Sequence, residues 1–217
     1  MKVLVVDDHP LILEALSQLL PHLTPGTAVP VARDRREAES TLDDNSDIAL
    51  VLLDLALPET RGLDFLADLL LDYPGVPVVV LSATHDQATV TAALAAGARG
   101  FIPKTANITA LVEALQQVVN GGVYLTPDLT KGLEADGVHL SPDELGLTMR
   151  QADVLKLLVQ GKPNKLICRD LKLSEGTVKV HVSAILKALR VHSRTQAVAE
   201  LARRGISVDA LAARRQT

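Results

Sequence analysis

In the first part of the chain, short apolar runs each end in a polar side chain, and this pattern constrains the fold more than any other feature. The runs cover residues 2–6, 48–53, 76–81 and 100–103, and the polar residues that follow them are Asp7, Asp8, Asp54, Ser82 and Lys104. In a parallel sheet, the carboxyl ends of neighbouring strands share one crevice, where α/β folds bind their ligands. We therefore expect three carboxylates, a hydroxyl and an ammonium group around one small volume, which suits a divalent cation and a phosphoryl group.

Residues 1–122 alternate between short β-branched runs and longer stretches with helical periodicity. This alternation is typical of a doubly wound α/β fold, in which helices cover both faces of a parallel sheet. We predict five strands at about 2–7, 28–32, 48–54, 76–82 and 100–103, and five helices at about 10–20, 35–43, 62–71, 87–96 and 107–120.

Charge divides the chain into an acidic N-terminal part and a basic C-terminal part. Residues 1–122 contain 7 Lys and Arg against 16 Asp and Glu, whereas residues 148–217 contain 14 against 5. Residues 123–147 lack sustained periodicity and predict a linker, in which 141–144 has the marks of a short capped helix. We expect two domains, of which the basic one meets a polyanion.

Residues 148–217 have the start signals of four short helices, which predict a small all-α domain. The segments 148–151 and 193–196 have the sequence of capping boxes, and Ser174 is a good N-cap residue. Two of the helices, at 164–171 and 174–189, are separated by about two residues, which is a helix-turn-helix geometry.

Composition narrows the cellular setting and the kind of metal site. Cys168 is the only cysteine, which excludes an intrachain disulfide and favours a reducing compartment. The N-terminus lacks the apolar region of a signal peptide, and no apolar run approaches the roughly 18 residues that span a bilayer. We expect a soluble cytoplasmic protein with no membrane partner. The six histidines show no paired ligand spacing, so a metal site here would use oxygen rather than zinc-type ligands.

The strand-end residues resemble the motif set of the receiver domain of two-component response regulators, over nearly all of residues 1–122. The resemblance implies a flavodoxin-like fold and a phosphoryl group accepted by Asp54 from a sensor histidine kinase. It implies Mg²⁺, or Mn²⁺, held by Asp8 and Asp54 with help from the Ala56 carbonyl, and by Asp7 through water. The matching positions are Asp7, Asp8, Asp54, Ser82, Phe101 and Lys104, with Pro58 and Gly62 in the loop after Asp54.

Phosphoryl transfer explains why these residue types are needed. Asp54 would act as an in-line nucleophile and form an acyl phosphate. The Lys104 ammonium and the Ser82 hydroxyl would each contact a phosphoryl oxygen. By resemblance, Ser82 moves inward on phosphorylation and Phe101 rotates into the space, so Ser82 and Phe101 form the switch. Lys104 is preceded by Pro103 and followed by Thr105, rather than by the proline common in receivers, so the sequence supports no claim about a cis bond there.

Residues 147 to about 201 resemble the LuxR-type helix-turn-helix, and the whole chain resembles a NarL/FixJ-class response regulator. The run 176–182 is the most specific part of this match. The family pattern is broken at Gln151 and Leu166, where glutamate is common, and at Lys172, where glycine is frequent in the turn. A lysine with positive φ carries a conformational cost.

The resemblance also assigns roles within the C-terminal helices. On the helix from Ser174, one stripe at Val178, Val182, Ile185 and Leu189 forms core, and the other face would enter the major groove of DNA. Base-edge contacts are expected from Lys179, Val180 and Ser183, and phosphate contacts from Thr177, Lys165, Lys187 and Arg194. Dimerisation is expected through Ala197, Val198 and Leu201 on the last helix, although that stripe could instead pack on its own domain.

These inferences favour a regulator of transcription and not a turnover enzyme. Phosphorylation of Asp54 is expected to make the protein a homodimer that binds double-stranded promoter DNA. Three alternatives stay open. A ligand-sensing regulator with the same C-terminal module fits poorly, because aromatic residues make up 2% of the chain and Trp is absent. A metal-dependent phosphohydrolase would need an acid or base beside Asp54, for which only Thr84 and His85 are near in sequence. A receiver that signals without phosphorylation is the third.

Overall fold

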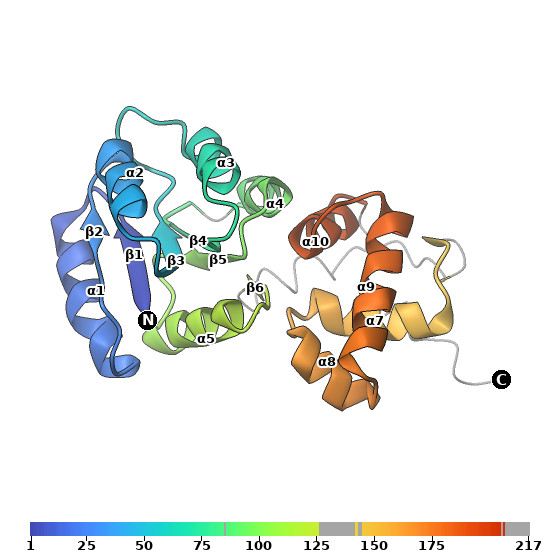
Figure 1. The fold of residues 1–217 in the computed structure, drawn as a ribbon. Coiled ribbons are helices and arrows are strands. Elements are labelled where there is room, and N and C mark those ends of the chain that lie inside the picture. Colours follow the sequence, from blue (N-terminus) through green and yellow to red (C-terminus); the bar gives the residue numbers. More distant parts are fainter. Residues whose placement is uncertain (85, 126–141, 143–144, 205, 207–217) are drawn as a thin grey trace.

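The computed structural model describes residues 1–84, 86–125, 142, 145–204 and 206. It has an α/β part at the N-terminal end and a helical part at the C-terminal end, as Figure 1 shows. None of the helices in the described ranges is long and apolar enough to cross a membrane. The short capped helix predicted at 141–144 lies largely outside the described residues.

The N-terminal part is built on a parallel sheet with the strand order β2-β1-β3-β4-β5-β6. The strands are β1 (Lys2–Val6), β2 (Val31–Ala32), β3 (Ile48–Leu53), β4 (Val78–Ser82), β5 (Gly100–Pro103) and β6 (Tyr124–Leu125). The doubly wound class predicted from the sequence is confirmed, but the prediction of five strands is wrong. The sixth pairs Tyr124 with Gly100 and Leu125 with Phe101, and at two residues it is too short to show a strand period in the sequence.

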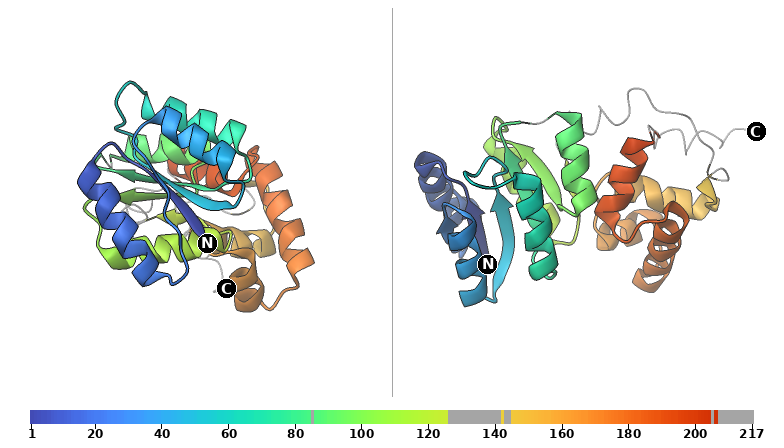
Figure 2. Two further views of the ribbon diagram at one scale, coloured as in Figure 1. Left: turned by 60° about the vertical axis from the view of Figure 1, so that its left-hand side comes forward. Right: turned by 90° about the horizontal axis from the view of Figure 1, so that it is seen from above.

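Helices cover both faces of this sheet because its strands are apolar on both sides. Along β1, Val3 and Val5 belong to one buried cluster, whereas Leu4 and Val6 belong to the other, as the two-residue period of a strand requires. The first cluster packs under α1 (Pro10–Leu23) and α5 (Ile108–Val119). The second packs under α2 (Arg35–Asp44), α3 (Gly62–Asp72) and α4 (Gln87–Ala96). Figure 2 shows the sheet between these two helical layers.

The C-terminal part consists of α7 (Met149–Val159), α8 (Asn164–Leu171), α9 (Glu175–Leu189) and α10 (Arg194–Arg203). The capping box predicted at the start of α7 is present, with Thr148 and Gln151 bonded reciprocally. Between α8 and α9, Lys172 adopts φ 54°, the left-handed conformation expected for this turn. Ser174 then caps α9 by accepting a hydrogen bond from the Thr177 N–H. These helices form the predicted helix-turn-helix.

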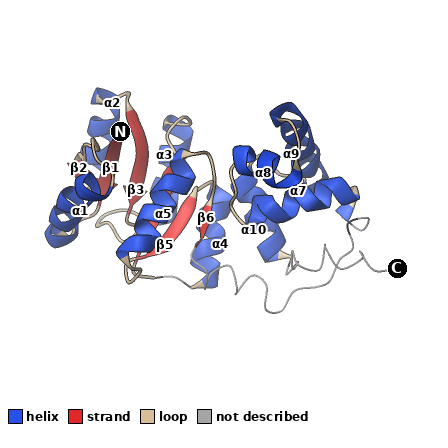
Figure 3. Cartoon of the chain, turned by 90° about the horizontal axis from the view of Figure 1, so that it is seen from below, coloured by secondary structure: helices blue, strands red, loops and turns tan. Residues whose placement is uncertain are grey.

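The helical part packs against the α/β part through α10, which lies alongside α4. Figures 1 and 3 show the C-terminal helices gathered at this side of the sheet. The buried cluster under α4 continues into the C-terminal helices without a break.

Candidate functional site

The strand-end residues meet at one edge of the sheet. Asp7 and Asp8 follow β1, Asp54 follows β3, Ser82 ends β4 and Lys104 follows β5. The strand order places β3 between β1 and β4, so Asp54 is central. Asp7, Asp54 and Ser82 are only 0, 1 and 3% exposed. The fold therefore buries three polar side chains at the edge where the sequence places them.

The ammonium group of Lys104 lies between two of these buried carboxylates. Its Nζ is 2.7 Å from Asp54 Oδ2 and 2.8 Å from Asp7 Oδ2. Burial opposes the charged amine, but hydrogen bonds with Asp54 and Asp7 outweigh burial and raise the pKa of Lys104. Lys104 is therefore a fixed positive charge beside the proposed nucleophile.

The acidic residues at this edge suit a hard divalent cation. One possible ligand atom from each of Asp7, Asp8, His9 and Asp54 lies within 4.8 Å of the others. Among the described residues, Asp7 Oδ2 and Asp8 Oδ1 are buried oxygens that accept no well-formed hydrogen bond, although each lies within ion-pair distance of a basic side chain. Because Mg²⁺ and Mn²⁺ prefer oxygen ligands, the residues present fit such an ion.

The loop after Asp54 holds the carboxylate of that residue in a fixed orientation. Asp54 Oδ1 accepts a hydrogen bond from the Ala56 N–H at 3.0 Å. The loop then folds back so tightly that a Cβ atom on Gly62 would lie 2.1 Å from the carbonyl oxygen of Leu55. Glycine is therefore required at the start of α3. The role of the Ala56 carbonyl as a metal ligand stays a prediction.

Sequence reasoning missed His9, which lies beside the acidic pair. Its Nδ1 is 3.0 Å from Asp7 Oδ1 and 2.7 Å from Asp8 Oδ1, and its side chain is 59% exposed. The imidazole therefore lies at the mouth of the site. A search for paired histidines cannot find it, because the only signal is that His9 follows two aspartates.

The two residues of the predicted switch lie on neighbouring strands. Ser82 Oγ accepts a hydrogen bond from the Thr84 N–H at 3.2 Å. Phe101 is on β5, is 0% exposed and belongs to the cluster under α4. The structure thus holds Phe101 inward, and rotation of its ring on phosphorylation stays a prediction.

On α9 the apolar stripe faces inward and the basic face is free. Val178, Ile185 and Leu189 are buried, Val182 is half-buried, and Val180 is 67% exposed. The remaining residues predicted to contact DNA on α8 and α9 are also exposed: Lys165, Thr177, Lys179, Ser183 and Lys187. Lys179 Nζ lies 3.0 Å from Glu175 Oε1 in a surface pair, which stabilises the helix little. Nothing in the described chain covers this face of α9.

Arg194 departs from its predicted role. It is 8% exposed, and its guanidinium donates hydrogen bonds to the carbonyl oxygens of Gly121 and Lys162. In this arrangement Arg194 cannot reach a DNA phosphate, so we correct that prediction. The reason is that Arg194 is the first residue of α10, where the helix meets both parts of the chain.

The predicted dimerisation residues are also covered. Ala197, Val198 and Leu201 are 0, 1 and 2% exposed. They belong to a buried cluster of their own chain that includes residues of α4 as well as of the other C-terminal helices, whereas the alternative that the sequence left open was packing on their own domain alone. A second copy cannot contact them in this arrangement.

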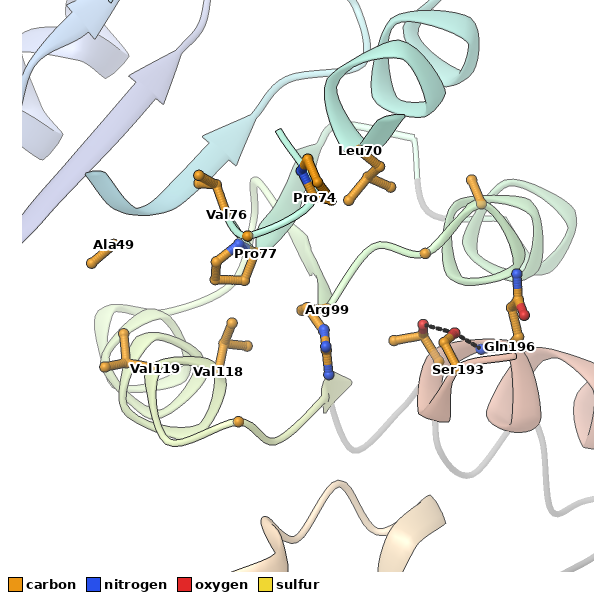
Figure 4. Close-up of a pocket in the computed structure, with 15 residues that line it drawn as sticks. Ala49, Leu70, Pro74, Val76, Pro77, Arg99, Val118, Val119, Ser193 and Gln196 are labelled. Carbon is orange, nitrogen blue, oxygen red and sulfur yellow. Dashed lines mark hydrogen bonds between the residues drawn. The ribbon is translucent and has the colours of Figure 1, made fainter. Parts of the chain in front are cut away.

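A cavity of about 470 Å³ lies between the two parts, at the opposite edge of the sheet from Asp54. Figure 4 shows Arg99, next to the start of a strand, between Pro77 on one side and Ser193 and Gln196 of the C-terminal part on the other. This space between the parts therefore lies away from the edge of the sheet that carries Asp7, Asp8 and Asp54, which we call the acidic edge.

Comparison with known proteins matches both parts of the chain. Residues 3–116 match the family model of the response regulator receiver domain, and residues 145–201 match that of the bacterial regulatory proteins of the luxR family. A glycerol metabolism activator from Pseudomonas putida is 38% identical over 91% of this chain and 93% of its own length. The nitrate/nitrite response regulator protein NarL from Escherichia coli K12 is 36% identical over 90% and 92%.

Solved structures show the same folds. A LuxR family DNA-binding response regulator from Silicibacter pomeroyi is 33% identical, with a TM-score of 0.52 over 58% of this chain and 97% of that one. RcsB from Salmonella enterica serovar Typhimurium, bound to a promoter in the presence of a phosphomimetic, has a TM-score of 0.55 over 93% and 98% of the two chains, at 21% identity.

The fold and these matches define a receiver domain joined to a LuxR-type DNA-binding domain. The chain belongs to the NarL/FixJ class of two-component response regulators, which regulate transcription.

Proposed function

We propose that Asp54 accepts a phosphoryl group from a sensor histidine kinase and that this modification controls dimerisation and promoter binding. The observation that carries the proposal is the ion contact of Lys104 with both Asp54 and Asp7, because it places a fixed cation beside a buried nucleophile. We propose 1–122 as the receiver, 123–147 as the linker and 148–217 as the DNA-binding domain, with β6 extending the receiver's sheet to Leu125.

The residues of the acidic edge would share the work of phosphoryl transfer. A carboxylate oxygen of Asp54 attacks phosphorus, and the bond from phosphorus to the donor breaks, which leaves an acyl phosphate. Asp7, Asp8 and Asp54 would hold Mg²⁺ or Mn²⁺, which neutralises charge on the transferring group. The Lys104 ammonium would move from Asp54 to a phosphoryl oxygen, and the Ser82 hydroxyl would donate to another.

We propose that the chain holds the phosphoryl group as a signal and does not turn over a substrate. A phosphohydrolase would need an acid or base aimed at Asp54. Among the described residues at this edge, His9 has a suitable imidazole, but that imidazole contacts Asp7 and Asp8. The proposed location is the cytoplasm, where a histidine kinase and promoter DNA are both accessible.

Incubation with acetyl phosphate and Mg²⁺ should add one phosphoryl group to the protein, detected by intact-mass spectrometry. Asp54→Asn should abolish this addition because the amide is not a nucleophile. Asp64→Asn, which alters an exposed acid in the first turn of α3, should label as the wild type does. Equal labelling of Asp54→Asn would place the modification elsewhere.

Lys179→Ala should weaken binding to a selected DNA site by about 1 to 3 kcal/mol and broaden the sequence preference, because Lys179 is proposed to reach base edges. Lys165→Ala removes an exposed cation on α8 and should weaken binding evenly across sequences, with a smaller salt dependence. In vitro selection with each variant compares them. An unchanged preference for Lys179→Ala would make Lys179 a phosphate contact.

A further inference from the structure

The backbone of His9 is held in place on both sides of the residue. Its N–H donates to Asp7 Oδ1 at 2.9 Å, and its carbonyl oxygen accepts hydrogen bonds from the Ile12 and Leu13 N–H groups in the first turn of α1. A proline restricts the residue before it to extended backbone, and His9, which precedes Pro10, has φ −87° and ψ 109°. The imidazole of His9 therefore starts from a fixed point beside the acidic edge.

His9 is the N-cap residue of α1, but its side chain does not cap the helix. An N-cap side chain usually accepts a hydrogen bond from the second or third N–H of the helix, whereas that of His9 makes no such bond. It turns instead to the two aspartates before it, where Nδ1 lies 3.0 Å from Asp7 Oδ1 and 2.7 Å from Asp8 Oδ1. Substitution of His9 therefore removes contacts with the acidic edge and no helix cap.

These two short contacts have the spacing of atoms that share a metal ion. Adjacent ligand atoms of an octahedral ion with bonds of about 2.1 Å lie about 3.0 Å apart. The contact of His9 Nδ1 with Asp8 Oδ1 is also no well-formed hydrogen bond, because this buried oxygen has no hydrogen-bond partner among the described residues. Asp7 and Asp54 each add an oxygen, and the four possible ligand atoms lie within 4.8 Å of one another. One nitrogen and three carboxylate oxygens are therefore grouped at this edge.

Lys104 and His9 contact different oxygens of Asp7. The ammonium Nζ lies 2.8 Å from Asp7 Oδ2, whereas the imidazole contacts Oδ1. The Lys104 side chain is 14% exposed and that of His9 is 59% exposed, so the ammonium lies inside the site and the imidazole at its mouth. His9 can therefore contact a bound ion from the solvent side while Lys104 stays beside Asp54.

We infer that His9 Nδ1 is a further ligand of the divalent ion and biases the site towards Mn²⁺ over Mg²⁺. Imidazole nitrogen suits transition-metal ions, whereas Mg²⁺ prefers oxygen ligands and keeps several of its waters. The neutral imidazole binds the ion through Nδ1 and carries its proton on Nε2. The inference rests on the proposed function, because it takes Asp7, Asp8 and Asp54 as the other metal-binding residues. It adds a nitrogen ligand to an otherwise all-oxygen site.

His9→Ala should weaken Mn²⁺ binding by at least about tenfold, the lower end of the loss that follows removal of a metal ligand's support. It should weaken Mg²⁺ binding much less. Electron paramagnetic resonance of free Mn²⁺ measures the first affinity, and displacement of Mn²⁺ by Mg²⁺ gives the second. His22→Ala is the matched control, because His22 is an exposed histidine of the same helix whose Nδ1 lies 2.6 Å from the Gln18 carbonyl oxygen. It should bind both ions as the wild type does.

Pulsed electron paramagnetic resonance of bound Mn²⁺ gives a second readout, which tests the inference even if His9→Ala does not fold. Coupling to a nitrogen nucleus should appear in the wild type and in His22→Ala, and should be absent from His9→Ala.

Three results would overturn the inference: no nitrogen coupling in the wild type, equal Mn²⁺ affinities of the wild type and His9→Ala, or tighter binding by His9→Ala. Tighter binding is the result expected if His9 were only a cation that pairs with Asp7 and Asp8, because its removal would then leave both carboxylates to the ion. The proposed function would survive all three, since labelling of Asp54 by acetyl phosphate with Mg²⁺ is measured separately. A wild type that binds neither ion would contradict both proposals.

Discussion

Lys104→Met is expected to lower the free energy of unfolding by about 3 to 5 kcal/mol at neutral pH. Lys104 Nζ lies within 2.8 Å of carboxylate oxygens of Asp54 and Asp7, and these residues are 1 and 0% exposed. Methionine keeps much of the side-chain volume but leaves two buried negative charges without their cation. Urea denaturation followed by circular dichroism measures the change.

Lys2→Met is the control variant for this stability measurement. Lys2→Met removes a cation that pairs with Asp47 at 2.8 Å, where the side chains are 33 and 66% exposed, and it should cost less than about 1 kcal/mol. Lys104→Met combined with Asp54→Asn should be more stable than Lys104→Met alone, because one of the unpaired charges is gone. If Lys104→Met cost no more than Lys2→Met, the ion contacts at the acidic edge would not hold the site together.

The acidic edge could be predicted from the sequence because the strands are parallel, so residues that directly follow different strands lie close together at one edge of the sheet. Each residue directly after an apolar run must lie at the carboxyl end of a strand, whichever helices cover the sheet. Asp54 and Lys104 are thus brought together across 50 residues of chain. His9 was missed because its role depends on side-chain geometry that the pattern of runs does not encode.

Local signals predicted the helices well and the sixth strand poorly. Caps such as Thr148 and Ser174 act within one turn, so the sequence beside them carries the information. The strand β6 instead depends on pairing between Tyr124 and Gly100, which are distant in sequence. A two-residue strand has too few residues to show a period of two.

The contact between the domains could not be predicted from either domain's pattern. The stripe of Ala197, Val198 and Leu201 is apolar whether it faces its own domain or a second copy. Likewise, the sequence shows Arg194 as one cation in a basic domain, whereas the structure surrounds it with backbone carbonyls. The structure places α10 against α4 of the other domain as well as against α7 and α9 of its own, a contact that neither pattern shows.

The second large effect is expected on DNA affinity when Asp54 is changed, because every part of the proposed switch depends on that carboxylate. Mg²⁺ with beryllofluoride, which mimics a phosphoryl group on aspartate, should strengthen wild-type binding to a selected DNA duplex by roughly 5- to 150-fold. Asp64→Asn, with an exposed acid changed on α3, should respond as the wild type does. Asp54→Asn should not respond, since it lacks the carboxylate that the beryllofluoride group needs.

The decisive measurement is therefore the ratio of DNA affinities with and without beryllofluoride, determined by fluorescence anisotropy for the wild type and Asp54→Asn. We predict a ratio well above one for the wild type and a ratio of one for Asp54→Asn. An equal response from the two proteins would contradict the claim that Asp54 controls DNA binding.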